Sequence, residues 1–339
     1  MQKAEPKGNY LTTTTTTLKK YGLSRGVLLL FLVLAIAPLV LKNEYLIHLL
    51  ISSLLYGSLA MGFDFTAGNI NIVNVGYAAF MGIGAYATGI LTTRLGISPW
   101  LGLIPAIVFA GILGFLTGLL TLRLRGIFAA IMTWFLGLTL YAAAANLIDL
   151  TRGQLGLSVP PLFDSGSKIP YFYIILVITI IVYVLLQLVL RSHIGIAFNA
   201  IGQDVDSAQA SGVNPVKYKV INFTISCMIA GLLGWFYAHF VGILTPEIMS
   251  TKVSVEILAL AYLGGRGSLW GGLLAALVLI PVFEYLRFLM EFRLIIYGVL
   301  LILVMIFFPG GIASVLKSLG KVWQKSIQIF RQMREKRAG

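Results

Sequence analysis

Long stretches without a single charged residue recur along the chain. A helix needs about 20 apolar residues to cross a hydrocarbon layer of ~30 Å, and most of these stretches are long enough. They are residues 26–41, 45–63, 65–93, 95–122, 126–148, 169–190, 220–246, 267–283 and 294–316. The pattern predicts a chain that crosses a membrane repeatedly as α-helices.

One further apolar segment, 253–265, is too short for an ordinary span and contains Glu256. If this segment crosses or half-crosses the membrane, the chain has ten segments and its two ends lie on the same side. Short segments interrupted by glycine line cavities or pack on protein, because bare backbone is not tolerated in lipid. We therefore expect an all-α polytopic membrane protein with about ten segments, one of them short and broken.

The charges support this interpretation through their positions. Of the 339 residues, 58% are hydrophobic and 11% are charged, and the formal net charge is +13. The Lys and Arg residues lie at the ends of the apolar stretches and not on one amphipathic face. This placement favours a lipid bilayer as partner, and we expect no nucleic acid.

The same charges predict the orientation of the chain in the cytoplasmic (inner) membrane. With the N-terminus inside, most of the 25 Lys and Arg residues fall in cytoplasmic segments, as the positive-inside rule requires. We expect a cytoplasmic tail at 1–25, a transmembrane domain at 26–316 and a basic cytoplasmic tail at 317–339. The loop at 149–168 is expected outside.

No pattern of catalytic residues occurs in the sequence. There is no G-x-x-x-x-G-K-[ST] phosphate-binding loop, no His/Cys metal spacing and no nucleophile constellation. The single cysteine, Cys227, lies inside an apolar stretch and is predicted to be a packing residue. We expect no enzymatic activity and no cofactor or metal in this chain, so the energy for any transport must come from another polypeptide.

A long polar interruption at 191–216 faces the cytoplasm in this topology. Within it, residues 204–212 are predicted to form a helix of about two turns. Asp204 suits the N-cap position, where its carboxylate accepts from free backbone N–H groups. Asp206 would lie in the first turn, where the helix dipole favours negative charge.

The end of this short helix is marked equally clearly. Ala208 is compatible with a helix, Gly212 suits a left-handed stop, and Pro215 prevents continuation. A helix of this length is marginal in water by itself. We therefore expect it to require a partner surface.

Asp206-Ser207-Ala208, followed after three residues by Gly212, resembles the Glu-Ala-Ala-x-x-x-Gly cytoplasmic loop of ABC-importer permeases. Further stretches are similar to the branched-chain amino-acid ABC permeases, and to the second (M-type) of their two membrane subunits. These stretches are GYAAFMGIGAY (76–86), LRLRGIFAAIMT (122–133), TRGQLGL (151–157), and LRSHIGIAFNAI (190–201) through GVNPVKYKVINFTISCMIAGLLGWFYA (212–238).

The resemblance implies a permease that forms a heterodimer with a sister permease. It implies two cytoplasmic ATPase subunits, which hold ATP and Mg, and an extracytoplasmic substrate-binding protein. It also implies that the short helix docks in a groove of the ATPase with Ala208 facing that groove. The residues expected at this contact are Asp204, Asp206, Ser207, Ala208, Gly212, Asn214 and Pro215.

The chain departs from the family pattern in two places. The family's Arg-Glu-x-Glu is replaced by Gly202-Gln203-Asp204-Val205-Asp206, which removes charges that could pair with the ATPase. The stretch GNINIVNVG (68–76) is more polar than usual and leaves the substrate open. Branched-chain amino acids are the default, with urea or short amides, other amino acids and nucleosides as alternatives.

Candidate residues for a substrate path are polar groups at membrane depth, which face a cavity or a partner. They are Asp64, Asn69, Asn71, Asn74 and Thr133. The competing interpretation is capping or interhelical hydrogen bonding for the asparagines and core packing for Thr133. Small residues at 82–89, 114–118 and 267–271 are expected to permit close helix packing.

Two other functional classes remain as alternatives. An ion-coupled secondary transporter also has broken helices but needs carboxylates inside the membrane, for which Asp64, Glu256 and Glu284 are candidates. A membrane enzyme would need a catalytic set that the sequence does not offer.

Overall fold

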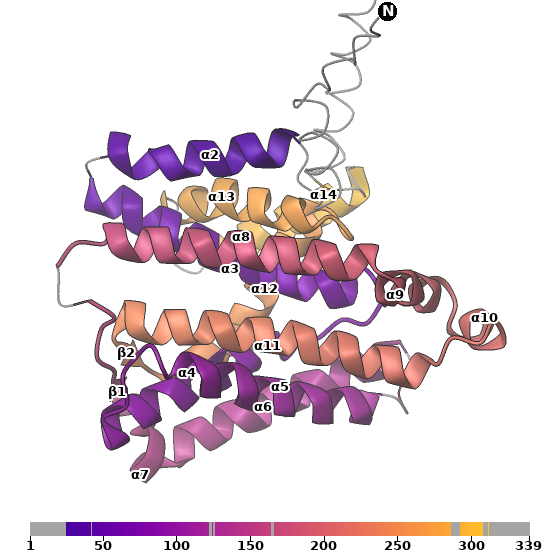
Figure 1. The fold of residues 1–339 in the computed structure, drawn as a ribbon, viewed down its shortest axis with the longest axis horizontal. Coiled ribbons are helices and arrows are strands. Elements are labelled where there is room, and N and C mark those ends of the chain that lie inside the picture. The colour runs from indigo at the N-terminus through magenta and orange to yellow at the C-terminus, as the bar shows by residue number, and fades with distance from the viewer. Residues whose placement is uncertain are drawn as a thin grey trace, which may run out of the picture.

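The computed structural model describes residues 25–41, 43–121, 124, 126–163, 166–285, 292–307 and 311. The two predicted cytoplasmic tails lie outside these residues, except for Arg25, which begins the first described helix. Most of the chain runs as helices that lie side by side in one bundle (Figure 1). The longer helices are α2 (Arg25–Val40), α3 (Glu44–Ala67), α4 (Tyr77–Leu95), α5 (Leu103–Thr121), α6 (Ile127–Asn146), α8 (Ile169–Arg191), α9 (His193–Gln203), α11 (Pro215–Val241), α12 (Thr251–Gly264), α13 (Leu269–Tyr285) and α14 (Phe292–Phe307).

Short elements close the two ends of the bundle. At one end lie α7 (Ile148–Thr151), the 3-10 helix η1 (Gly153–Leu155), and the strands β1 (Leu157–Ser158) and β2 (Ile243–Leu244). A second 3-10 helix, η2 (Pro246–Met249), follows β2 and packs on α4 and α6. The strands pair antiparallel, with Leu157 opposite Leu244, so the fold is helical apart from this small ribbon. At the opposite end, α10 (Val205–Ala210) projects beyond the bundle (Figure 1).

The helices agree with a membrane protein, but the expected number of spans is not confirmed. Among the described residues, five helices are long and apolar enough to cross a membrane. A sixth span is added if α12 and α13, which meet at 113°, are counted as one broken span. The predicted short segment at 253–265 is thus a real helix of 14 residues, and it ends at a sharp break.

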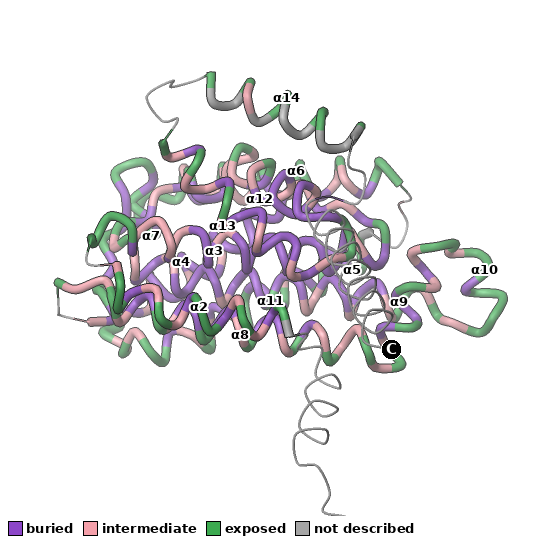
Figure 2. The backbone as a smooth tube through the Cα atoms, turned by 90° about the horizontal axis from the view of Figure 1, so that it is seen from above, coloured by how far each residue is buried: buried purple, intermediate pink, exposed green. Residues whose placement is uncertain are grey.

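Helix α11 lies in the middle of the bundle and packs on α3, α4 and α5. Glycines permit these close contacts: Gly84 of α4 lies against Gly231 of α11, and Gly114 of α5 lies against Cys227. A side chain at either glycine would collide with the neighbouring helix. The predicted packing roles of the small residues at 82–89 and 114–118 and of Cys227, which is fully buried, are confirmed. Gly267 lies in the break before α13 and not on a helix face. Figure 2 shows this buried interior surrounded by exposed outer helix faces.

The uncharged stretch at 65–93 does not form one continuous helix. Helix α3 extends to Ala67, and α4 begins only at Tyr77. Between them the backbone is not helical, and Asn71 has a φ of +58°. Asparagine tolerates this left-handed geometry, and close contacts on both sides hold the segment in place. Gly68 lies against Gly267, and Gly76 lies against Thr133 of α6.

Candidate functional site

The short helix predicted within 204–212 is formed and bounded as its sequence predicts. Asp204 has extended backbone angles, and its Oδ1 accepts from the Ser207 N–H at 2.6 Å. The helix ends in a paired hydrogen-bond pattern, in which Val213 N donates to Ala208 O and Gly212 N donates to Gln209 O. This is a Schellman motif, and Gly212 supplies its left-handed residue with a φ of +85°.

Asn214 and Pro215 have a second role that the sequence reasoning missed. The Asn214 side chain accepts from the Lys217 N–H at 3.2 Å and so caps the next helix, α11. Pro215 is the first residue of that helix, where a missing N–H costs nothing. Thus α10 ends and α11 begins within five residues, which fixes the angle between them.

The structure contradicts the expected orientation of Ala208. This residue is 4% exposed in the chain itself, so its side chain is turned towards the protein and not towards an external groove. The exposed residues of α10 are Asp206, Ser207, Gln209 and Ala210. A partner protein would therefore meet this polar face of α10.

Helix α9 precedes α10, and it was not predicted. It has its own N-cap, because Ser192 accepts from the Ile194 N–H at 3.2 Å. Its Phe198 ring packs edge-on against Phe65 of α3, with ring centroids 5.6 Å apart. The spacing of Ile194, Phe198 and Ile201 is that of one helix face, and this pattern could have revealed the element. Helix α9 anchors α10 to the bundle.

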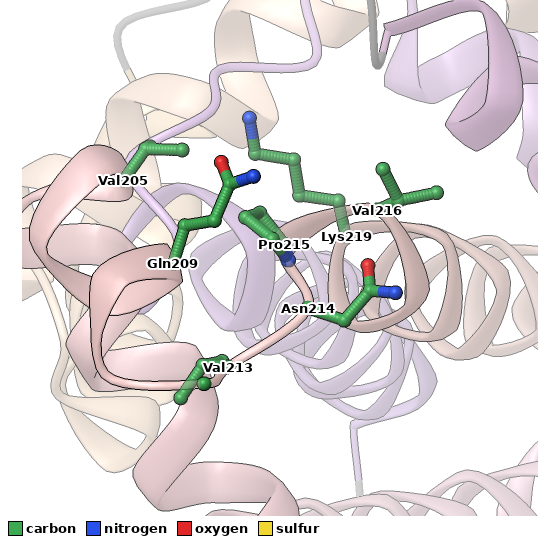
Figure 3. Close-up of a pocket in the computed structure, with 8 residues that line it drawn as sticks. Val205, Gln209, Val213, Asn214, Pro215, Val216 and Lys219 are labelled. Atoms are coloured by element: carbon green, nitrogen blue, oxygen red, sulfur yellow. The ribbon is translucent and has the colours of Figure 1, made fainter.

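A hollow of about 440 Å³ lies between α10 and the start of α11. Gln209 and Lys219 extend into it from opposite sides, above Pro215 (Figure 3). Lys219 is only 6% exposed, so its positive charge lies within the hollow and not on the open surface. The lining of the hollow combines amide groups and an ammonium group.

Two of the polar residues expected along a substrate path, Asp64 and Thr133, bond to the backbone of broken segments. Asp64 Oδ1 accepts from the Gly267 N–H at 2.9 Å, which ties the end of α3 to the break between α12 and α13. Asn69 donates to the Phe65 carbonyl, and Thr133 accepts from the Val75 N–H at 3.2 Å. Asp64, Asn69, Asn74 and Thr133 are at most 8% exposed. In this conformation these four side chains cannot contact a passing solute.

Comparison with known proteins decides which family the molecule represents. The sequence matches the family described as branched-chain amino acid transport system / permease component over residues 45–307. The chain belongs to this family. It is a permease component of a membrane transport system, and the matched region includes the α9–α10 element and both broken segments.

Individual relatives of this permease are recognisable at moderate identity. The high-affinity branched-chain amino acid transport system permease protein LivM of Escherichia coli is 28% identical over 313 residues, which cover 84% of this chain and 74% of LivM. LivH of the same organism is 26% identical over 76% of this chain and 90% of LivH. The fructose import permease protein FrcC of Rhizobium meliloti is 25% identical over 61% of each chain. No solved structure matches significantly.

Arg266 is a further site residue of the permease that sequence reasoning missed. It lies in the break between α12 and α13 and donates to the Ala67 carbonyl and to Asn71 Oδ1. Arg266 and the Asp64–Gly267 contact therefore join the α3–α4 break to the α12–α13 break. The run Gly264-Gly265-Arg266-Gly267 could have revealed this residue, because it places a single charge in a glycine-rich turn.

Proposed function

We propose that this permease is one of the two membrane subunits of an ABC importer for branched-chain amino acids. The similarity to LivM and LivH, which are both described as branched-chain amino acid permease proteins, supports this substrate class. We place the chain in the cytoplasmic membrane with both termini in the cytoplasm, because this orientation puts most Lys and Arg residues inside.

The proposed importer contains three further kinds of subunit. A sister permease completes the path, two cytoplasmic ATPase subunits bind and hydrolyse ATP with Mg, and an extracytoplasmic protein delivers the substrate. The sequence contains no phosphate-binding loop, which agrees with ATP hydrolysis by separate subunits. The chain itself would contribute the path and the contact with the ATPase.

The observation that carries the proposal is the α9–α10 element. Helix α10 is capped at both ends, projects from one end of the bundle and presents Asp206, Ser207, Gln209 and Ala210 outward. A six-residue helix has little stability of its own, so its defined geometry suits a docking role. Closure of the ATPase on ATP would favour one permease conformation by binding it better than the other.

Reconstitution tests this function. The chain is co-purified with its sister permease, ATPase subunits and binding protein, and the complex is inserted in liposomes. We expect ATP-dependent uptake of radiolabelled leucine, and no uptake when the phosphate-binding-loop lysine of the ATPase is substituted. Fructose, urea and a nucleoside serve as competing solutes. ATP-dependent uptake of one of these, without leucine uptake, would contradict the proposed substrate class.

A further inference from the structure

A stripe of polar side chains lies on α6, the helix that also carries the buried Thr133. Trp134 and Tyr141 are seven residues apart, which places them on one helix face. Trp134 Nε1 donates to Thr251 Oγ1 at 2.9 Å, and Tyr141 Oη donates to Glu247 Oε1 at 3.1 Å. Gln154 donates in turn to Tyr141 Oη at 3.4 Å.

These contacts fix how deep the Glu247 carboxylate lies. Tyr141 is about 21 Å along α6 from its start and about 8 Å from its end, at 1.5 Å per residue. Side chains on a helix tilt towards its N-terminus. The Tyr141 hydroxyl is therefore at least as far from the C-terminal end of α6 as the Tyr141 Cα atom is. Helix α6 is long and apolar enough to span a hydrocarbon layer of ~30 Å, and from this we infer that the carboxylate lies within that layer.

Lipid cannot cover this stripe. Glu247 and Gln154 are exposed in the chain, and Trp134 is 39% exposed. A carboxylate is costly in hydrocarbon, and ionisable residues at membrane depth face a partner or a water-filled cavity. The stripe must therefore meet either the sister permease or the aqueous path.

The character of the stripe favours the path. Where helices of this chain pack closely, they do so through glycine and alanine, as at Gly84 and Gly231. The stripe instead consists of bulky side chains whose polar tips bond to one another and leave the carboxylate accessible. An ammonium group pairs well with such a carboxylate, and the neighbouring indole and phenol rings attract cations and cover aliphatic groups.

We propose that Glu247 lines the translocation path and binds the ammonium group of the amino acid in transit, with its carboxylate oriented by Tyr141. This inference rests on the proposed function, because it takes an α-amino acid as the substrate. It assigns substrate contact to the α6–η2 surface in place of Asp64, Asn69, Asn74 and Thr133, which are buried.

Uptake by the reconstituted importer tests the role of Glu247. We expect Glu247→Gln to lower leucine uptake about tenfold or more, which corresponds to ~1.4 kcal/mol, while the sister permease still co-purifies. Tyr141→Phe should lower uptake less, because the carboxylate remains. Asp149→Asn, at an exposed acid of the neighbouring α7, is the matched control and should transport like wild type.

Water access provides an independent readout. Glu247→Cys is made in a Cys227→Ala background and treated with a membrane-impermeant, negatively charged thiol reagent. We expect modification in the assembled importer, and no modification of Val177→Cys, which lies exposed on the outer face of α8.

The possible results separate the inference from the proposed function. Normal leucine uptake by Glu247→Gln would overturn the role of Glu247 and leave the proposed function intact. A Glu247→Cys thiol that stays unreactive with and without ATP would do the same. Loss of the sister permease from the Glu247→Gln complex would overturn that role in favour of a subunit contact. A wild-type complex that takes up no amino acid would instead contradict the proposed function.

Discussion

Gly212 and Gly96 share a backbone geometry that other residues avoid. Their φ angles are +85° and +62°, and a Cβ atom at either position would meet no atom within 4 Å. Any cost of substitution is therefore conformational and not steric. The two glycines differ in location, because Gly212 ends the projecting α10 and Gly96 ends α4.

This pair gives a controlled prediction at the residue scale. Gly212→Val and Gly96→Val should each cost about 1–2 kcal/mol, because a β-branched residue is strained in the left-handed region. We expect only Gly212→Val to lower the leucine transported per ATP hydrolysed in the reconstituted importer. Gly212→Asn should retain coupling, since asparagine tolerates this geometry. If Gly212→Val, Gly96→Val and Gly212→Asn all transport the same amount of leucine per ATP hydrolysed, the end of α10 has no role in docking.

At the scale of elements, α9 and α10 differ in how they are stabilised. Helix α9 buries Phe198 and Ile201 against the bundle, so tertiary packing supports it. Helix α10 has six residues and a single buried side chain, Ala208, and depends on its caps. Loss of a cap should therefore affect the two helices unequally.

We predict that Asp204→Ala disrupts α10 and that Ser192→Ala leaves α9 in place. Each substitution removes one N-cap hydrogen bond, which contributes ~1 kcal/mol. Hydrogen exchange of the purified chain should accelerate at residues 205–210 in Asp204→Ala and change little at 193–203 in Ser192→Ala. Because α10 is the proposed contact with the ATPase, we expect only Asp204→Ala to lower the amount of ATPase that co-purifies. Similar exchange changes in both variants would show that packing does not protect α9.

At the scale of the whole molecule, the bundle has two distinct ends. One carries α9 and α10, and the other carries α7 and the β1–β2 ribbon (Figure 1). The turn at 96–102 belongs to the second end, because Arg94 donates to the Leu150 carbonyl. The proposed topology puts the first end in the cytoplasm and the second end outside.

Cysteine accessibility tests this orientation. In a Cys227→Ala background, Ser211→Cys should react with an impermeant thiol reagent only in inverted membrane vesicles, and Ser98→Cys only in intact cells. Both serines are exposed and adjoin these two ends. The sequence alone suggests Ser165 in the loop at 149–168 and Ser326 in the C-terminal tail as labelling sites, and both lie outside the described residues. Labelling of both cysteines from one side would refute the topology.

The sequence alone determined the features that depend on neighbouring residues. Asp204, Gly212 and Pro215 define α10 because caps and stops act within about five positions. The apolar stretches determined a membrane-spanning helical protein because length and hydrophobicity are local properties. The family was recognisable for the same reason, from short contiguous stretches.

Only the tertiary structure decided which side chains are accessible. Ala208, expected to face a partner, is buried in its own chain, and Asp64 is bound to Gly267, some 200 residues away. The break at 68–76 lies where α3 meets Arg266 and Gly267, and the Glu247 carboxylate lies beside Tyr141 of another helix. Contacts of this kind depend on how distant helices pack, and no local pattern encodes them. That packing decided which polar residues hold the protein together and which are open to a substrate.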